Sequence, residues 1–461
     1  MNRRILVLTA VLLSSLSFPL TITGASVALP GLAGDLDASL TGAQWVVTGY
    51  NLCFAAFLAF GGSLADLLGR RRLYVAGVVA FLVGSVLCAV AGNIGVLIAA
   101  RLLAGVGAAV ATATGQSLLA AAFDGQARAR VFGALGTILG IGLACGPTVS
   151  GFLVDVVGWR AVFGVPAVLA GLVLLLCPAL PAVPGVGDKA VDWSGGSLFT
   201  VGLGALIWVF VEAPVLGLFH PVVLGAVLLA VASAVGFVRV ERRRRAPMFD
   251  LALLGDRAFL GYSLVAAAMM GLLVPLLVYL PSYFIDVIGL DAAQAGLWML
   301  MLTLPSVLLP GVGAAVSRRS PRLLSIGAIL VSTVGVVALV TIGPAATPWT
   351  LLGPLLLIGT GIGVTTGVVD GLAISSAPTA QAGTAAGLFN TARLATETVT
   401  LATVGSALAF LSGGHLVGDG FTDALRTVVL ALGCFGVVAA GGANLLLRQK
   451  VDATAPHRRS R

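Results

Sequence analysis

Long apolar runs, separated by short segments with charged residues, glycine or proline, extend along almost the whole chain. A helix needs about 20 mostly apolar residues to cross the hydrocarbon core of a bilayer. Fourteen runs meet this requirement, near residues 5–29, 43–65, 73–92, 94–120, 131–154, 161–180, 195–216, 221–240, 258–281, 292–315, 323–343, 349–371, 384–411 and 424–447. The pattern predicts an all-α polytopic membrane protein with fourteen transmembrane helices. A transmembrane β-barrel would show alternating strands of about ten residues instead.

The first run begins like a secretory signal, with Arg3 and Arg4 ahead of an apolar segment. The apolar segment continues to Leu29, which is too long for the central region of a signal peptide. We therefore expect a retained first helix.

Basic residues occupy alternate connections between the runs, and acidic residues occupy the others. One set contains Arg3, Arg4, Arg70–Arg72, Arg128, Arg130, Lys189, Arg242–Arg245, Arg318, Arg319, Arg322 and the tail from Arg448. The opposite set contains Asp35, Asp37, Asp155, Asp286, Asp291, Asp419 and Asp423, with Arg160 as a basic exception. Because Lys and Arg are enriched in cytoplasmic loops, both termini are expected in the cytoplasm. The scarcity of lysine hints at a GC-rich bacterial genome and indicates nothing more. The expected location is a bacterial cytoplasmic membrane.

Composition agrees with this class of protein, since 59% of residues are hydrophobic and only 10% are charged. A soluble domain usually has about a quarter of its residues charged. The net charge of +8 comes from loops, so it indicates orientation and not nucleic-acid binding. The five cysteines lie within apolar runs without metal-binding spacing, and the three histidines lie in loops or the tail. No cofactor, metal or enzymatic activity is expected, and a membrane receptor or enzyme is the remote alternative.

The chain shows a weak internal repeat. "GSLADLLGRR", from Gly62, can be laid over "GAAVSRRSPR", from Gly313, and both segments end an even-numbered run on the basic side. This placement is expected of two parallel halves related about the membrane normal. We predict a six-helix bundle over residues 1–183, an inserted helix pair over 184–245, a second six-helix bundle over 246–450 and a tail over 451–461.

Motifs throughout the chain resemble those of the major facilitator superfamily. The loop after the second run fits the family signature G-x-L-A-D-x-x-G-R-R at Gly62, Leu64, Ala65, Asp66, Gly69, Arg70 and Arg71. "SVALP", "QWVVTGYNL", "ARLLAGVGAA", "GPTVSG", "WRAVF" and "NTAR" are similar to segments of its fourteen-helix drug:proton antiporter branch. The resemblance implies two rocking bundles that export small compounds in exchange for protons.

The resemblance also implies roles for particular residues. Arg101 in the fourth run is expected to take part in proton coupling, and Gly142, Gly146, Pro147 and Gly151 form the antiporter motif of the fifth run. Independently of the family, glycines spaced about one turn apart provide a groove for a neighbouring helix, and a Gly-Pro pair permits a bend. The turn at Gly62–Arg71 is expected to act as a conformational latch through Asp66, or simply to orient the chain.

One position departs from the family pattern. Many members of this branch carry an aspartate in the first helix, where alignment on "VALP" places Thr21 in this chain. The usual first-helix proton or cation site is therefore missing, and the coupling acid must be sought elsewhere.

Few acidic residues lie within the apolar runs, and Glu397 and Asp370 are the notable ones. A charge near the bilayer centre needs a partner or a water-filled cavity. Glu397 could form a permanent ion pair with Arg393, one turn away. Alternatively, it could load and release protons, because desolvation favours the neutral carboxyl. Direct recognition of a cationic substrate and a coupling role for Asp370 remain further alternatives.

Thr21, Tyr50, Asn51, Gln116 and Trp298 are candidates for the substrate cavity. The expected function is proton-coupled export of small amphipathic compounds or antibiotics by alternating access. Export of an endogenous metabolite or import of a nutrient by the same fold is the alternative. The expected partners are a small-molecule substrate, protons and the lipid bilayer, without nucleic acid.

Overall fold

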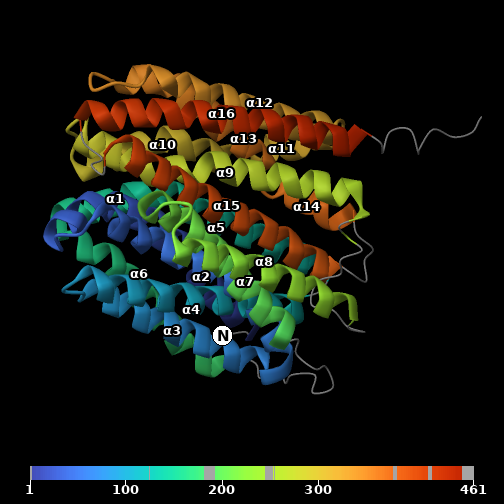
Figure 1. Cartoon of the computed structure of the whole chain (residues 1–461). Coiled ribbons are helices and arrows are strands. Elements are labelled where there is room, and N and C mark those ends of the chain that lie inside the picture. The colour runs from blue at the N-terminus through green and yellow to red at the C-terminus, as the bar shows by residue number, and fades with distance from the viewer. Residues whose placement is uncertain are drawn as a thin grey trace, which may run out of the picture.

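The computed structural model describes residues 3–123, 125–180, 193–243, 253, 255–376, 382–413 and 418–448. All regular secondary structure in these ranges is helical (Figure 1). The α-helices are α1 (Arg3–Asp35), α2 (Leu40–Leu68), α3 (Arg70–Ala89), α4 (Ile94–Ala122), α5 (Gly125–Val157), α6 (Trp159–Leu176), α7 (Trp193–Leu216), α8 (Pro221–Arg243), α9 (Arg257–Asp286), α10 (Ala292–Leu308), α11 (Pro310–Ser317), α12 (Pro321–Ala338), α13 (Pro348–Thr365), α14 (Val368–Ser376), α15 (Ala382–Leu411) and α16 (Gly418–Arg448). Short 3₁₀ segments follow α6 (η1, Cys177–Ala179) and α12 (η3, Leu339–Thr341).

The structure confirms a polytopic helical membrane protein. In its described part, 12 helices are long and apolar enough to cross a membrane, or up to 13 if the bent pair α10 and α11 counts as one span. Each predicted run coincides with a helix or a helix pair. The helix outside this set of spans is α2, which has 29 residues. The predicted number of fourteen is therefore not reached by length and apolarity alone.

The predicted helix 292–315 was wrong as a single element, whereas 349–371 corresponds to one candidate span, Pro348–Ser376, with a local interruption. The first is divided into α10 and α11, which meet at an angle of 43°. Pro310 begins α11, and proline has no N–H to donate and clashes with the preceding turn. The second is divided into α13 and α14 at Gly367, whose φ of 73° favours glycine. The span of α10 and α11 is thus bent, whereas α13 and α14 together still form one candidate span.

The helices form an N-terminal set, α1–α6, and a C-terminal set, α9–α16. Figure 1 shows the first in blue to teal and the second in yellow to red, with the green pair α7 and α8 beside them. The two sets meet where α5 packs against α10, α2 against α15, and α1 against α9. The α7 helix contacts both α2 and α15.

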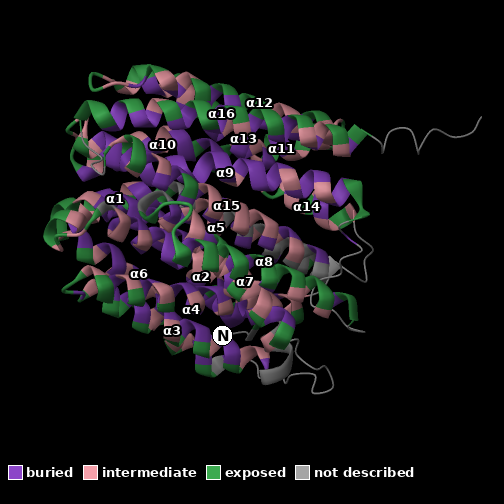
Figure 2. Cartoon of the chain, in the orientation of Figure 1, coloured by how far each residue is buried: buried purple, intermediate pink, exposed green. Residues whose placement is uncertain are grey.

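Burial separates the centre of the bundle from its lipid-facing surface. α9 is almost entirely enclosed, whereas α8 is the most exposed of the candidate spans (Figure 2). The exposed side chains of α8 include Val222, Leu228 and Val231. In a bilayer such apolar side chains contact lipid, so their exposure carries no cost there.

The bundle has two chemically different ends. At its acidic end α1 stops at Asp35 and α10 follows Asp291, whereas at its basic end α3 begins at Arg70 and α8 stops at Arg243. Three side chains hydrogen-bond across the two sets toward the acidic end. Ser26 donates to the Leu277 carbonyl over 3.1 Å, Gln44 to the Gly405 carbonyl over 2.6 Å, and Thr148 to the Gly296 carbonyl over 2.8 Å.

A carboxylate completes this closure. Asp155, near the end of α5, accepts from the backbone N–H groups of Ala292 at 3.2 Å and Ala293 at 2.8 Å. These N–H groups open α10 and have no partner within their own helix, and the helix dipole favours a negative charge beside them. The two sets are therefore fastened together at the acidic end.

Candidate functional site

The antiparallel helices α2 and α15 bring polar residues of the two sets together inside the bundle. The Gln44–Gly405 hydrogen bond fixes their register. Asn51 lies seven residues beyond Gln44, and Thr398 and Glu397 lie seven and eight residues before Gly405. At 1.5 Å per residue, these positions are about 10–12 Å deeper than that hydrogen bond on both helices. A seven-residue step also returns to nearly the same helix face, so Asn51 faces α15 at the depth of Glu397.

Glu397 lies near the middle of α15 and is only 7% exposed. Within the described residues its carboxyl makes no hydrogen bond or ion pair. Arg393, one turn away, instead pairs through Nη1 with Asp370 Oδ1 of α14 at 3.5 Å. In this conformation the described ion pair of Arg393 is with Asp370 and not with Glu397, and the alternatives for Glu397 stay predictions. α14, which follows Gly367, packs against α15 and brings Asp370 to the guanidinium.

Arg101 lies inside the N-terminal set and is completely buried. Its Nε donates to the Val46 carbonyl over 2.6 Å, and its guanidinium carbon lies 4.3 Å from the centre of the Tyr50 ring and 5.6 Å from that of Phe163. Nη1 and Nη2 have no hydrogen-bond partner in the part of the chain that the structure describes. Aromatic faces attract a cation, but the structure places no carboxylate on this guanidinium among the residues it describes.

Three further candidates are buried with unsatisfied polar atoms. They are Thr21 Oγ1, the Tyr50 hydroxyl and both amide atoms of Asn51. Tyr50 is 0% exposed and Asn51 is 3% exposed. Most buried polar groups in proteins have partners, so it is unusual that two consecutive residues of α2, Tyr50 and Asn51, both lack them.

The glycines predicted for the antiporter motif lie on α5 where neighbouring helices approach. A side chain at Gly142 would meet Leu16 and Pro19 of α1, and one at Gly146 would meet Thr23. A side chain at Gly151 would meet the Ala292 carbonyl of α10, and Gly296 lies directly against the Pro147 carbonyl. These residues therefore serve close packing on both sides of α5, and Pro147 lies within the helix.

The predicted latch segment forms the turn between α2 and α3. Gly69 separates the helices with a φ of 88°, a conformation that favours glycine. Arg70 Nη1 donates to the Ser117 carbonyl over 3.3 Å, and Arg71 Nη2 donates to the Pro178 carbonyl over 2.9 Å. Gly62 and Asp66 belong to α2, but their surroundings lie outside the described residues. The latch role of Asp66 stays a prediction.

The remaining cavity candidates are not joined to this group by a described contact. Gln116 is partly buried on α4, and Trp298 of α10 packs edge-to-face on Phe284 at 5.4 Å between ring centres. Sequence reasoning missed Gln44 and Asp155, which link the two sets. It also missed Trp45, whose Nε1 donates to Glu212 Oε1 of α7 over 2.8 Å. A glutamine and a glutamate within apolar runs were the available signals.

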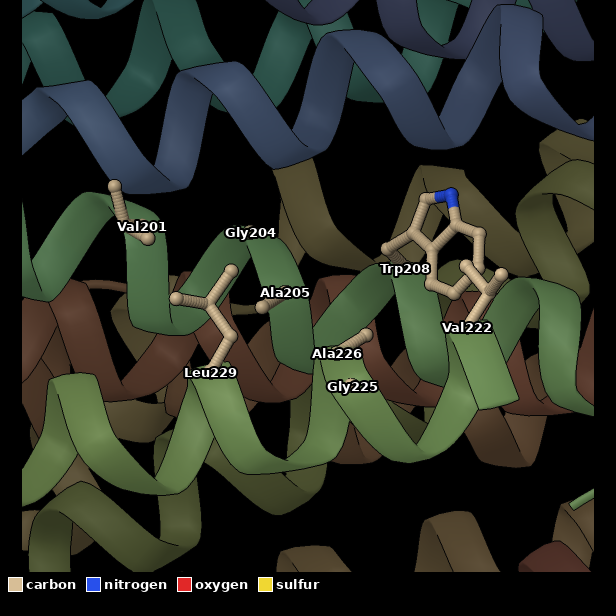
Figure 3. Close-up of a pocket in the computed structure, with 8 residues that line it drawn as sticks. All are labelled: Val201, Gly204, Ala205, Trp208, Val222, Gly225, Ala226 and Leu229. Atoms are coloured by element: carbon tan, nitrogen blue, oxygen red, sulfur yellow. The ribbon is translucent and has the colours of Figure 1, made fainter. Parts of the chain in front are cut away.

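A shallow apolar pocket of about 500 Å³ lies elsewhere, between α7 and α8 (Figure 3). It is lined by Val201, Gly204, Ala205, Trp208, Val222, Gly225, Ala226 and Leu229. No carboxylate or other charged group lines it. The buried polar residues of α1, α2, α4 and α15 therefore define the better candidate site.

Comparison with known proteins places these features in context. The model of the Major Facilitator Superfamily matches residues 11–396. Multidrug resistance protein Stp of Mycobacterium tuberculosis is 32% identical over 83% of this chain and 72% of its own length. Puromycin resistance protein pur8 of Streptomyces alboniger is 33% identical over 84% of this chain and 78% of its own length. The crystal structure of the peptide transporter POT has the same fold, with a TM-score of 0.70 at 16% identity over 95% of this chain and 94% of that chain.

Proposed function

Because the chain belongs to the major facilitator superfamily, and is thus a multi-pass membrane transporter of small molecules and not an enzyme, we propose that it exports amphipathic compounds or antibiotics in exchange for protons. The relatives named for multidrug and puromycin resistance support export of such compounds. Alternating access between two helix bundles is the corresponding mechanism.

The architecture of this proposal has fourteen spans. They comprise the 12 candidate spans, one of which contains both α13 and α14, the bent pair of α10 and α11, and α2, whose 29 residues exceed the length that a bilayer requires. The N-terminal bundle comprises residues 1–183 and the C-terminal bundle residues 246–450, with the inserted pair in 184–245. The predicted tail, 451–461, lies outside the described residues. The basic end faces the cytoplasm of a bacterial cell, since Lys and Arg favour that side.

The proposed coupling role rests on the surroundings of Glu397. It is buried in the seam between the two sets, has no ion-pair partner among the described residues, and lies one turn from an arginine held by Asp370. A carboxyl in such surroundings is favoured in its neutral form, whereas an approaching cation or donor favours the anion. Movement of the two sets against each other can therefore change its affinity for a proton, which is what coupling requires.

Efflux measurements test this function. Cells deficient in their own drug pumps would express the wild type, Glu397→Gln or Glu212→Gln, and would be loaded with ethidium or puromycin with and without a protonophore. We expect wild-type efflux that the protonophore abolishes and Glu397→Gln loses. Glu212→Gln is the matched control, because a glutamine oxygen can still accept from Trp45. Efflux that resists the protonophore, or normal pumping by Glu397→Gln at equal membrane abundance, would contradict the coupling role.

The same fold could instead export a metabolite made by the cell or import a nutrient. Uptake into cells and efflux from preloaded inverted vesicles distinguish the directions. Fusion of a cytoplasm-dependent reporter to the C-terminus tests the proposed orientation, and an inactive fusion would contradict it.

A further inference from the structure

The unsatisfied polar groups of α2 lie opposite the buried acid of α15. Asn51 lies two helical turns deeper than Gln44 and on the same face of α2, which is turned toward α15. Neither amide atom of Asn51 has a hydrogen-bond partner among the described residues. Tyr50, the preceding residue, also has a buried and unpartnered hydroxyl. Glu397 reaches the same depth from the opposite helix. Asn51 thus lies on the α15 side of α2 at the depth of Glu397, and the neighbouring Tyr50 lies within electrostatic range of that carboxyl. Among the described residues, neither the Asn51 amide nor the Tyr50 hydroxyl has a hydrogen-bond partner, and no hydrogen bond is described for the Glu397 carboxyl.

The apolar surroundings determine which protonation state of Glu397 is stable. Ala55 of α2 and Leu394 and Ala402 of α15 lie in one buried cluster that flanks the seam. A protonated carboxyl is tolerated in such a place, because it carries no charge. An ionised carboxylate requires donors, and buried hydrogen bonds to a charged group are about twice as strong as neutral ones.

Tyr50 also connects the seam to the buried arginine. Its ring stacks on the Arg101 guanidinium at 4.3 Å, and both Arg101 and Glu397 lie within electrostatic range of its phenol group. A hydroxyl that donates to Glu397 would therefore be polarised by the cation that lies over the ring. The charge of Arg101 favours that donation.

Other ionisable groups on helices packed against α15 are engaged or directed elsewhere. Asp370 of α14 pairs with Arg393, Glu212 of α7 accepts from Trp45, and Asp423 and Arg426 of α16 pair with each other. Tyr279 of α9 lies against Gly405 toward the acidic end, and Cys53 of α2 lies against Gly105 of α4. Among the described residues, Asn51 and Tyr50 are the unpartnered donors of α2 at this depth, whereas Arg393 Nε of α15 and the two Nη atoms of Arg101 of α4 are further buried donors without a partner.

We propose that the Asn51 amide and the Tyr50 hydroxyl receive the carboxylate of Glu397 when it loses its proton, so that deprotonation draws α2 and α15 into a new relative position. This inference rests on the coupling role proposed above for Glu397. Asn51 and Tyr50 are then positioning residues, which set how readily Glu397 holds a proton and transmit its loss to the N-terminal set.

Infrared spectroscopy of the purified full-length protein tests this proposal without a substrate. The carbonyl-stretch band of protonated carboxyl groups would be titrated in the wild type, Glu397→Gln, Asn51→Leu and Tyr50→Phe. Loss of donors to the anion favours the protonated form, so Asn51→Leu and Tyr50→Phe should each move the midpoint upward by about one pH unit. Tyr74→Phe is the matched control, since it removes a buried hydroxyl of α3 that bonds to Ser14 and Ala10.

The outcomes separate the two proposals. A band component that disappears in Glu397→Gln and shifts in both α2 variants, but not in Tyr74→Phe, supports the inference. A component that disappears in Glu397→Gln yet keeps its midpoint in both α2 variants overturns the inference alone. A spectrum unchanged in Glu397→Gln shows that this residue does not titrate, and overturns the coupling role together with the inference. Tyr50→Phe preserves ring packing, so a folded variant is available even if Asn51→Leu is unstable.

Discussion

Removing the Asp155 carboxylate should open the acidic end of the bundle. In the structure this side chain of α5 accepts two backbone N–H groups at the start of α10, at 3.2 and 2.8 Å. A hydrogen bond to a charged group contributes about 1.5–3 kcal/mol, and a charge at a helix terminus about 0.3–1 kcal/mol. Because Asp155 is exposed, we take a total of about 1.5 kcal/mol, near the lower limit. That corresponds to roughly a tenfold change in the ratio of closed to open states.

Spin labels at Val90 and Trp349 would report this change. Both positions lie at the acidic end, on opposite sets of helices, and are 69% and 82% exposed, so the labels should not disturb packing. Pulsed electron resonance gives the distribution of distances between them. If the wild type populates the open state to about 1%, Asp155→Ala should populate it to about 10%.

Asp291→Ala is the control for this experiment. Asp291 caps the same helix, since its carboxylate accepts from the Gln294 N–H over 2.6 Å, but it belongs to the C-terminal set. Its removal weakens the start of α10 without removing a link between the sets. An unchanged distance distribution in Asp155→Ala, or an equal change in both variants, would refute the reasoning that Asp155 fastens the two sets together.

Three further predictions concern other parts of the bundle. Gly367→Ala should lower the free energy of unfolding of the purified protein by about 1–2 kcal/mol, as thermal unfolding would measure, because φ is 73° at this position. Gly371→Ala in α14 should have little effect. Trp45→Phe should lower the free energy of unfolding by about 1–2 kcal/mol, because it removes the hydrogen bond to Glu212. The effect should largely vanish in a Glu212→Ala background, as a double-mutant cycle of unfolding would measure. Asp370→Asn should move the pH profile of efflux to lower pH, since the freed Arg393 can approach Glu397 and favour its anion; an unchanged or upward-shifted profile would contradict this.

The positions of the helices could be read from the sequence because bilayer thickness sets a minimum length for each apolar run. The breaks within spans could not. Pro310 begins a new helix, whereas Pro275 and Pro281 lie inside an unbroken α9 and Pro305 lies inside α10. Proline removes one hydrogen bond in each case. Whether the helix then bends depends on the packing of neighbouring helices, which the local sequence does not contain.

In the candidate site, too, the sequence indicates individual residues but not how they are paired. Glu397 and Arg101 could be singled out from residue type alone, because a charge within an apolar run demands an explanation. The partner of Arg393 could not, since Asp370 lies on a different helix, α14, and reaches Arg393 only through the packing of α14 against α15. The register between α2 and α15 was equally hidden, because it depends on one hydrogen bond from Gln44 to a backbone carbonyl.

The contacts at the closed acidic end and the buried polar groups of α2 without partners have opposite effects on the equilibrium between the closed and the open conformation. Closure gains the Asp155 bonds and the tight packing of Gly151 on the Ala292 carbonyl. It also leaves Asn51 and the Tyr50 hydroxyl buried without partners, and each such group costs about 1–3 kcal/mol. A conformation that gave these groups a partner would recover part of that cost while losing the bonds at the acidic end. These opposing contributions reduce the difference in free energy between the two conformations, and one proton or one bound substrate shifts the balance by as much as it favours one of them.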